Sequence, residues 1–315
     1  MSSAAEAADS HPSQKKDDKI KSQDANKRVV VKNKYLKENP HSSFLQSSSP
    51  NGSVGLNSIM KKSKTRVRKT LEGKPEFVMS LVETQNVLEK FAKSKTALVV
   101  LHVDLVGSTK MAMRLPIDRL TMMIQAFNQE MSIAVKAFGG YILKYVGDAV
   151  LAFFVISGDK SEAKVACVNA VNCARYMLRI AREGINPILN QYDYPEMNLR
   201  IGVDIGENAI IQSGWDIHSP SSRKNNKNIN ITKYDKKQHI LVKKPVYDVL
   251  SYTLSIAVKM TALANPNHLV IGEPAYNLLD DKQRSGFQRL EITPDIWSYV
   301  CQNSEGNLYS LFTDI

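Results

Sequence analysis

The chain has 315 residues, of which 43% are hydrophobic and 23% are charged, a composition typical of a globular protein with one large domain or two small ones. The formal net charge is +11, but residues 1–74 contain 16 Lys and Arg against 7 Asp and Glu, so most of the positive charge lies there. The remaining chain is close to neutral. This excludes a basic nucleic-acid-binding platform in the folded part, and no specific nucleic-acid binding is expected.

Cysteine usage and hydropathy indicate the cellular compartment. The three cysteines form no CxxC pair and no even framework, which favours a reducing environment. No apolar run approaches the ~20 residues of a membrane-spanning helix, and the N-terminus lacks the charged start and apolar centre of a signal peptide. We therefore expect a cytoplasmic protein.

The N-terminal residues divide into a tail and a helix. Residues 1–74 are rich in Ser, Lys, Asn and Asp and poor in large apolar residues, which predicts a disordered basic tail. The basic cluster at 61–69 suits contact with an anionic partner or a membrane surface, although a solvated linker is the simpler interpretation. In residues 75–95, apolar side chains recur at three- and four-residue steps, which predicts a helix before a domain at 96–315.

The segment at 97–154 organises the rest of the chain. Short β-branched and aromatic runs bounded by glycine predict strands, and Gly147-Asp148 between two of them predicts a tight hairpin. The predicted order is strand (97–103), amphipathic helix (114–138), strand (141–146), hairpin and strand (149–154). Because a helical crossover is right-handed, the second strand runs parallel to the first. This arrangement places Asp104, at the end of the first strand, and Asp148, at the hairpin tip, at the same edge of one sheet.

Two carboxylates at one sheet edge are candidate metal ligands. With no Lys or Arg adjacent in sequence, Asp104 and Asp148 repel each other unless a cation lies between them. Their hard oxygens suit Mg²⁺ or Mn²⁺ shared with substrate phosphates, and Gly107, Ser108 and Thr109 at the helix start offer backbone N–H groups to those phosphates. The alternative is structural, since an Asp at a strand end often caps a helix and an Asp after Gly often serves a turn. The pairing of the two favours the metal site.

The residues that follow complete the core. We expect helices and strands in alternation, with helices at 161–182, 247–263 and 273–279, strands at 198–205, 209–212 and 268–271, and a β-rich region at 287–312. The first six elements give the order β-α-β-β-α-β. The predicted fold class is therefore α+β, with a ferredoxin-like core and a C-terminal β-rich extension. Residues 216–246 are polar and lysine-rich and are expected to form a basic loop or insertion.

Four motifs, in this order, resemble the catalytic domains of class III adenylyl and guanylyl cyclases. Residues 103–109 (VDLVGST) and 144–149 (KYVGDA) are similar to the two metal-binding signatures of that family. Residues 199–206 (LRIGVDIG) resemble its central strand and glycine segment, and residues 247–260 resemble the segment with base-recognition and transition-state groups. The resemblance covers residues 96–279.

The resemblance implies two-metal catalysis. Asp104 and Asp148, with the backbone of Leu105, would hold two Mg²⁺ or Mn²⁺ ions, one lowering the pKa of the ribose 3′-hydroxyl and the other neutralising charge on the triphosphate and the departing pyrophosphate. Lys144 and Asp248 fall on the base-selecting positions, where an ammonium donates to adenine N1 and a carboxylate accepts from the N6 amino group. The structural alternatives for these two are an outward-facing strand lysine and a helix cap.

Two positions depart from the family pattern. Ser255 stands where the family usually has Asn, and Lys259 where it usually has Arg. They lie four residues apart on the predicted helix, hence on one face, as transition-state groups require. The hydroxyl reaches less far than an amide, and the ammonium lacks the planar fork of a guanidinium. The family's late phosphate-binding Lys has no convincing match at 287–312.

The activity that the resemblance implies is conversion of ATP to 3′,5′-cyclic AMP and pyrophosphate. Its site would lie at a homodimer interface, with metal ligands from one protomer and base and transition-state groups from its partner. Two alternatives stay open: a cyclase acting on another nucleotide base, and a catalytically degenerate cyclase domain that binds nucleotide and regulates a partner. The hairpin lacks the Gly-Gly-Glu/Asp-Glu-Phe pattern, which argues against a diguanylate cyclase.

Overall fold

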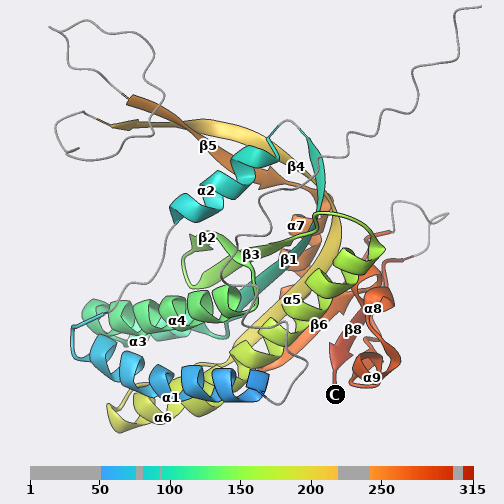
Figure 1. Ribbon diagram of the computed structural model, residues 1–315. Coiled ribbons are helices and arrows are strands. Elements are labelled where there is room, and N and C mark those ends of the chain that lie inside the picture. Colours follow the sequence, from blue (N-terminus) through green and yellow to red (C-terminus); the bar gives the residue numbers. More distant parts are fainter. Residues whose placement is uncertain (1–50, 76–80, 93, 219–241, 301–307) are drawn as a thin grey trace, which may run out of the picture. The chain divides into compact units, whose positions relative to one another are not determined.

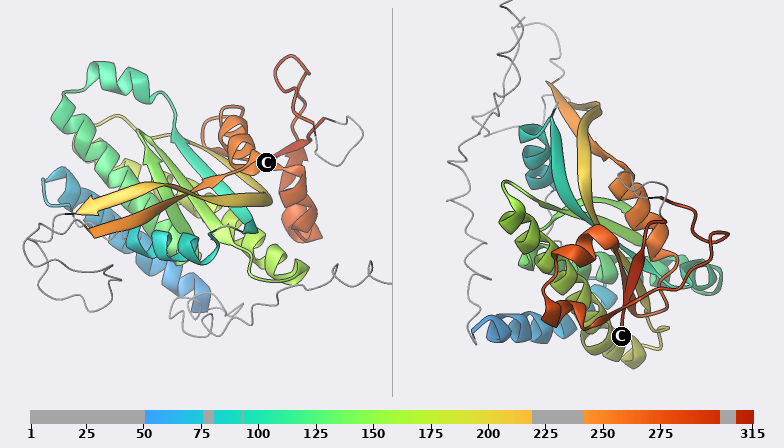
Figure 2. Two further views of the ribbon diagram at one scale, coloured as in Figure 1. Left: turned by 90° about the horizontal axis from the view of Figure 1, so that it is seen from above. Right: turned by 90° about the vertical axis from the view of Figure 1, so that its right-hand side faces the viewer.

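The computed structural model describes residues 51–75, 81–92, 94–218, 242–300 and 308–315. Within them one mixed sheet carries helices on both faces (Figures 1 and 2). The strands are β1 (Lys95–Leu105), β2 (Tyr141–Val146), β3 (Ala149–Val155), β4 (Leu199–His218), β5 (Val242–Leu250), β6 (His268–Gly272), β7 (Phe287–Arg289) and β8 (Leu311–Asp314). The helices are α1 (Asn51–Leu71), α2 (Leu81–Lys90), α3 (Ser108–Arg114), α4 (Ile117–Ala137), α5 (Lys160–Ile180), the π-helix η3 (Ala181–Ile185), α6 (Asn186–Gln191), α7 (Tyr252–Thr261), α8 (Glu273–Leu278) and α9 (Asp281–Arg284).

The first four strands form the predicted β-α-β-β-α-β core. The sheet order is β2-β3-β1-β4-β6-β8-β7, and β5 pairs with β4 beside this path. β1 is antiparallel to β3 and to β4, and β3 is antiparallel to β2. β2 therefore runs parallel to β1, as the right-handed crossover requires, and β2-β3-β1-β4 is the ferredoxin-like order. The α+β fold class is confirmed.

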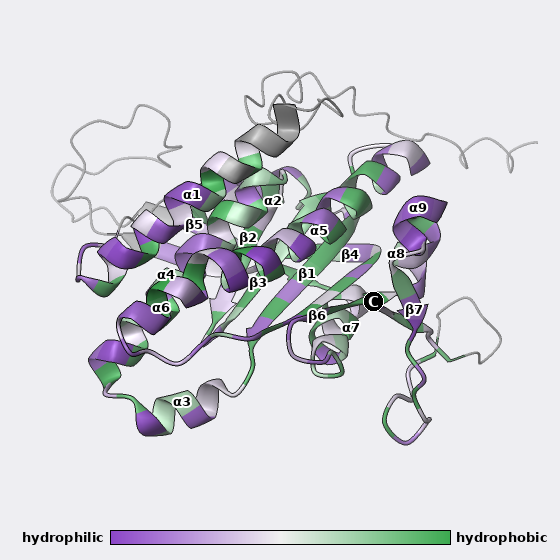
Figure 3. Ribbon diagram, turned by 90° about the horizontal axis from the view of Figure 1, so that it is seen from below, coloured by the Kyte–Doolittle hydropathy of each residue, from purple (hydrophilic) through white to green (hydrophobic). Residues whose placement is uncertain are grey.

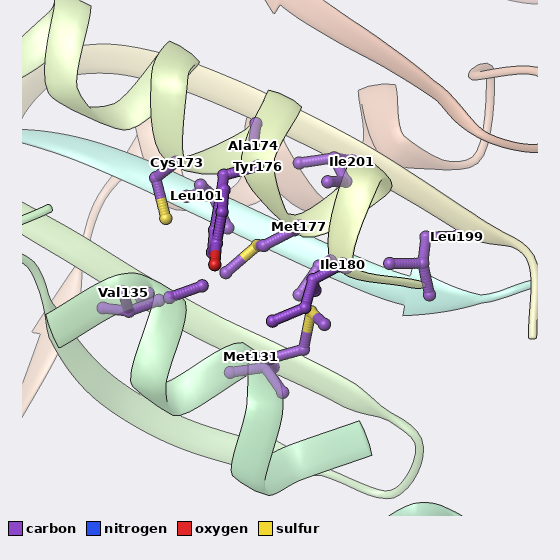
Figure 4. Packing of buried hydrophobic residues seen from close by; sticks show 14 of the residues in the cluster. Leu101, Met131, Val135, Cys173, Ala174, Tyr176, Met177, Ile180, Leu199 and Ile201 are labelled. Carbon is purple, nitrogen blue, oxygen red and sulfur yellow. The ribbon is translucent and has the colours of Figure 1, made fainter. Parts of the chain in front are cut away.

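The larger hydrophobic core lies between the sheet and the helices α4 and α5, which run side by side over one face of the strands (Figure 3). Met131 of α4, Met177 of α5 and Leu101 of β1 are fully buried there (Figure 4). Because strand side chains alternate, every second residue of β1 faces this core. The residues between them, including His102 and Asp104, face the opposite side of the sheet.

The opposite face is covered by α2 and α7. Leu88 of α2 and Ala257 of α7 are buried in a second cluster with Leu98 and Val100 of β1. α7 approaches β4 so closely that a Cβ on Gly202 would lie 2.3 Å from the carbonyl oxygen of Ala257. The side chain of Asp104, near the C-terminal end of β1, lies on this face of the sheet.

Helix α1 corrects the prediction of a disordered tail over residues 1–74. Residues 1–50 lie outside the described part of the chain, but α1 packs against α4, η3 and α6. Val67 is fully buried, and Arg66 donates two hydrogen bonds to Glu130 of α4, at 2.7 and 2.6 Å. The few apolar side chains of this basic stretch lie on one side of the helix, so a small number of contacts is enough to anchor it.

Strand β4 is longer than predicted. It runs through the two short strands expected at 198–205 and 209–212, and it pairs first with β1 and then with β5. The ends of the basic loop expected at 216–246 are therefore strand, with Asp216 opposite Lys244. The middle of that expected loop lies outside the described residues.

The helix expected at 247–263 begins later than predicted. β5 continues to Leu250, and Ser251 then caps α7 by accepting a hydrogen bond from the Leu254 amide at 2.9 Å. Residues at the start of the predicted segment therefore belong to a strand, which changes the surroundings of Asp248.

The helix predicted at 75–95 is shorter in the structure. It is α2, which ends at Lys90, and residues 76–80 lie outside the described part of the chain. The β-rich region expected at 287–312 contains β7, the first residues of β8 and one isolated bridge between Val300 and Leu308. None of the helices in the described ranges combines the length and apolar character needed to cross a membrane.

Candidate active site

Asp104 and Asp148 lie close together at one edge of the sheet. Asp104 is opposite Ala149 in the register of β1 and β3, and Asp148 directly precedes Ala149 in the hairpin turn. Gly147 permits this tight turn because it adopts a φ of 62°, which side chains disfavour. The topology thus brings together the two carboxylates that the sequence singled out.

A cation of the chain itself faces Asp104. Nη2 of Arg200 donates to Oδ2 of Asp104 at 2.7 Å, and the two residues are opposite each other in the register of β1 and β4. Nε of Arg200 is buried and has no hydrogen-bond partner within the described ranges. Although no Lys or Arg is adjacent to Asp104 in sequence, Arg200 therefore neutralises part of its charge in the fold. The sequence held no local signal for this pair, because 96 residues separate its members.

His102 connects the carboxylate edge to α7. Its Nδ1 lies 3.0 Å from Oγ1 of Thr261, whose hydroxyl donates to the carbonyl oxygen of Ala257 at 2.7 Å. Because that hydroxyl proton is engaged, we assign the proton of the neutral imidazole to Nδ1. Burial lowers the pKa of His102, while the negative charges of Asp104 and Asp148 act in the opposite direction. Sequence reasoning missed this contact, which joins residues 159 positions apart.

The predicted phosphate donors lie at the start of α3. Gly107 adopts a φ of 73° and directly precedes Ser108, the first residue of the helix, and Thr109 follows. The first amides of a helix have no partner within it and point outward. Binding of phosphate by these amides stays a prediction.

Lys144 and Asp248 form an ion pair between β2 and β5, with Nζ 2.5 Å from Oδ2. Asp248 is thus a strand residue rather than a helix cap, and Lys144 is not a solvated strand lysine without a partner. The two side chains are 41% and 30% exposed, so both remain accessible to a ligand. The structure places the two predicted base-selecting residues in contact, although 104 positions separate them.

A β-bulge turns Lys144 toward this contact. The register of β2 and β3 shifts between Ile142 and Lys144 and leaves Leu143 as the extra residue. Ile142 packs in the larger core, whereas Leu143 packs on the opposite face of the sheet. Strict alternation would return Lys144 to the side of the larger core, and the bulge keeps it on the other face.

Ser255 and Lys259 lie on the exposed side of α7. Oγ of Ser255 donates to the carbonyl oxygen of Ser251 at 3.3 Å, and Nζ of Lys259 lies 5.3 Å from the centre of the Tyr299 ring. Within the described ranges, no hydrogen bond or ion pair joins either side chain to the carboxylate edge. The two predicted transition-state residues therefore share one helix face, but the single chain does not bring them to Asp104.

The carboxylate edge fits a divalent cation in combination with a substrate. No group of three or more His, Cys, Asp and Glu side chains in the described residues is arranged to hold a metal ion by itself. Mg²⁺ commonly takes only one or two carboxylates, together with phosphate oxygens and water. Asp104 and Asp148 match that donor set, provided that Arg200 shares or releases Oδ2 of Asp104.

Comparison with known proteins finds partial sequence similarity to proteins named cytidylate cyclases. No protein-family model matches the sequence. The chain is 25% identical over 118 residues to a cytidylate cyclase from Escherichia coli and 30% identical over 112 residues to a cytidylate cyclase from Staphylococcus aureus. These matches cover 37% and 35% of this chain but 26% of each relative, so the chain spans about a quarter of the length of the curated relatives it matches.

Similar solved structures also carry cyclase names. The guanylyl cyclase Cya2 aligns with a TM-score of 0.49 and 14% identity, over 70% of this chain and 92% of that chain. The adenylyl cyclase CyaB from P. aeruginosa aligns with a TM-score of 0.46 and 15% identity, over 70% of this chain and 95% of that chain. The names of these relatives and structures specify three different bases: cytosine, guanine and adenine.

Proposed function

We propose that this chain is a nucleotide cyclase, which converts a nucleoside triphosphate to its 3′,5′-cyclic monophosphate and pyrophosphate. The observation that carries the proposal is the meeting of Asp104 and Asp148 at one sheet edge, with Arg200 beside them. Carboxylates that hold divalent cations against a triphosphate, next to a guanidinium, suit phosphoryl transfer. The sequence similarity to cytidylate cyclases supports the same class.

In the proposed reaction, the ribose 3′-oxygen bonds to the α-phosphorus, its proton passes to water, and the bond to the bridging oxygen breaks to release pyrophosphate. Two Mg²⁺ or Mn²⁺ ions, when bound, would acidify the 3′-hydroxyl and neutralise the triphosphate. Asp104 and Asp148, with the backbone of Leu105, would hold them. The guanidinium of Arg200 would supply charge-assisted hydrogen bonds to phosphate oxygens. The amides at Ser108 add neutral donors.

The Lys144–Asp248 pair favours a base with an amino group beside an unprotonated ring nitrogen. The ammonium donates to the ring nitrogen, and the carboxylate accepts from the amino group. Adenine offers this pattern at N1 and N6, and cytosine offers it at N3 and N4. Guanine and uracil instead carry a ring N–H beside a carbonyl oxygen. The pair therefore supports ATP and CTP over GTP and UTP.

ATP is the first candidate substrate, and CTP is the second. The resemblance of Lys144 and Asp248 to the adenine-selecting positions favours ATP. The names of the sequence relatives, both cytidylate cyclases, favour CTP. A purine carries its amino group farther from the ribose than a pyrimidine does, so one position of the Lys144–Asp248 pair suits one of the two bases better. The kcat/KM values for ATP and CTP decide between them.

We also propose that the active form is a homodimer. Ser255 and Lys259 lie on the exposed side of α7, where a second copy of the chain can present them to a nucleotide held by the carboxylates of the first. Under this proposal one chain holds the metal ions and triphosphate, and its partner supplies the base-selecting and transition-state groups.

The proposal is tested with the full-length chain, Mn²⁺ and each of the four nucleoside triphosphates, with cyclic product and pyrophosphate identified by mass spectrometry. We expect product from ATP or CTP, and a loss of at least about 10²-fold in rate for Asp104→Ala and Asp148→Ala. Asp281→Ala, which changes a fully exposed acidic side chain of α9, is the matched control and is expected to keep full activity. Tight binding without turnover in the wild-type chain would instead support the regulatory alternative.

A further inference from the structure

The two strands that carry the base-selecting pair both present an edge to α2. β2 is the last strand of the sheet, and β5 pairs with β4 beside the main strand order. Backbone N–H and C=O groups along such edges need other partners. α2 lies against both strands (Figure 1). Its side chains supply those partners.

The side chain of Gln85 hydrogen-bonds to the edge of β5 in the way that a neighbouring strand would. Its Nε2 donates to the carbonyl oxygen of Tyr247 at 3.0 Å, and its Oε1 accepts from the Tyr247 amide at 2.7 Å. One side-chain amide thus satisfies both backbone groups of the residue that directly precedes Asp248. These two bonds fix the backbone from which the Asp248 carboxylate projects.

Thr84, the neighbouring residue of α2, holds β2. Its hydroxyl donates to the carbonyl oxygen of Ile142 at 2.8 Å, and the residue is only 3% exposed. Ile142 is the residue at which the β-bulge begins. The hydroxyl therefore stabilises the bulge that keeps Lys144 on the same face as its partner.

An apolar contact joins the same two strands. Leu88, one turn further along α2, is buried in one cluster with Leu143 and Val249. Leu143 directly precedes Lys144, and Val249 directly follows Asp248. The ion pair is partly exposed, and exposed ion pairs contribute little to stability, so the pair does not fix this geometry alone.

We propose that Thr84 and Gln85 are positioning residues that set base selectivity, because they fix the separation of Lys144 and Asp248 from outside the nucleotide site. This inference rests on the proposed function, since it assumes that the pair reads a base. Two simultaneous hydrogen bonds to one base need a donor and an acceptor at a fixed spacing. Removing the hydrogen bonds from α2 is therefore expected to lower the ratio of kcat/KM between bases more than it lowers kcat.

Matched variants of the full-length chain separate positioning from packing. Gln85→Met keeps the length of the side chain and removes both hydrogen bonds to Tyr247. Thr84→Val keeps the shape and removes the hydroxyl, and Thr84→Ser restores the hydroxyl. Asn86→Ala changes an exposed neighbour on the same helix and is the control.

The first readout is kcat and KM for ATP, CTP, GTP and UTP. For Gln85→Met and Thr84→Val, we expect the ratio of kcat/KM for the preferred base to that for GTP to fall by about 10-fold or more, chiefly through KM. Thr84→Ser and Asn86→Ala keep the wild-type ratio. An unchanged ratio in the first two variants, or an equal loss with all four substrates, overturns the proposal.

A second readout does not depend on turnover. The four triphosphates compete against a fluorescent nucleotide analogue for the same proteins, which gives a base preference in binding. A wild-type chain that binds with base preference but forms no cyclic product contradicts the cyclase proposal, and the binding ratios of the variants then decide the role of α2. A chain that forms cyclic product from all four triphosphates without base preference keeps the cyclase proposal and overturns the proposed role of α2. Faster hydrogen exchange at the Tyr247 amide in Gln85→Met is expected in every case, and unchanged exchange contradicts the α2 contact itself.

Discussion

Tyr309 donates a hydrogen bond to Asp204 in the protein interior, with the phenol oxygen 2.5 Å from Oδ1. Asp204 is 1% exposed on β4, and Tyr309 is 5% exposed in the C-terminal segment. Burial raises the pKa of Asp204 to about 7, although the hydrogen bonds from Tyr309 and the Ile205 amide act to lower it. Burial, together with the negative charge of Asp204, raises the pKa of the Cys167 thiol to about 12. The C-terminal segment is thus fastened to the central strand by a carboxyl group that titrates near neutral pH.

Asp204 is expected to make the protein less stable as pH rises. Its pKa in the folded chain lies above the ordinary value of 3.8, so the folded state binds the extra proton between these two values. The stabilising contribution is fully present below about pH 4 and is lost as pH rises through about 7. Denaturant unfolding across this range checks the prediction. Asp204→Asn is expected to flatten the slope, and equal slopes in the wild-type chain and the variant would contradict it.

Arg200 is expected to compete with the divalent cation for Asp104. Removing the guanidinium in Arg200→Ala frees Oδ2 of Asp104, so the Mn²⁺ concentration for half-maximal activity falls. The maximal rate falls as well, by on the order of 10²-fold, because a charge-assisted donor to the triphosphate is lost. Arg200→Lys keeps the charge but not the fork, and it is expected to be intermediate. A metal requirement that stays the same in Arg200→Ala would show that the ion pair does not limit metal binding.

The departures at Ser255 and Lys259 are expected to limit turnover. The double variant Ser255→Asn, Lys259→Arg restores an amide with longer reach and a guanidinium that grips phosphate in two places, so kcat is expected to rise by about 10-fold or more while KM changes less. Lys259→Gln, which removes the charge, is expected to lower kcat. Steady-state kinetics with the preferred triphosphate measure both effects. If the double variant is no faster, these positions do not act on the transition state.

The buried ion pair between Arg66 and Glu130 is expected to anchor α1. Their side chains are 12% and 0% exposed, so Glu130→Ala leaves a guanidinium without its partner in a nearly dry site. We expect the free energy of unfolding to fall by about 3 kcal/mol. Glu207→Ala breaks an exposed pair with Lys95 and is expected to change stability by at most about 1 kcal/mol. Urea unfolding of both variants makes the comparison, and similar losses would refute a special role for the buried pair.

The close approach of α7 to β4 is expected to tolerate no side chain at Gly202. A Cβ there would lie 2.3 Å from the Ala257 carbonyl oxygen and 2.5 Å from Oγ1 of Thr261. Gly202→Ala therefore pushes α7 away from the sheet and is expected to destabilise the fold by about 1–3 kcal/mol. Gly214→Ala, further along the same strand, meets no atom within 4 Å and serves as the control. Thermal unfolding of the two variants is the measurement.

The parts of the site that depend on local order could be predicted from sequence. Asp104 and Asp148 lie at the same edge because the elements from β1 to β3 obey the crossover rule, and that rule needs no knowledge of long-range register. The assignment of Lys144 and Asp248 to base-selecting positions depended on family resemblance, and their ion pair was not predicted. The β-bulge that enables it has no signal in the sequence around Ile142.

The parts that depend on register could not be predicted. The contact of Arg200 with Asp104 requires the alignment of β1 with β4, and the contact of His102 with Thr261 requires the seating of α7. The break expected in β4 also has a specific cause, since glycine disfavours strand interiors. Gly206 is tolerated because Thr253 of α7 occupies the space of its missing side chain.

The unbroken course of β4 has a mechanical consequence. Arg200 faces Asp104 at one end of the strand, and Ile211, on the same backbone, faces Asp248 through β5. Every residue from one to the other is held by neighbouring strands, with Ala209 paired to both β1 and β5. No loop lies along this backbone to serve as a hinge. If the proposed function is correct, the backbone separation of Arg200 and Asp248 therefore stays fixed when a nucleotide binds.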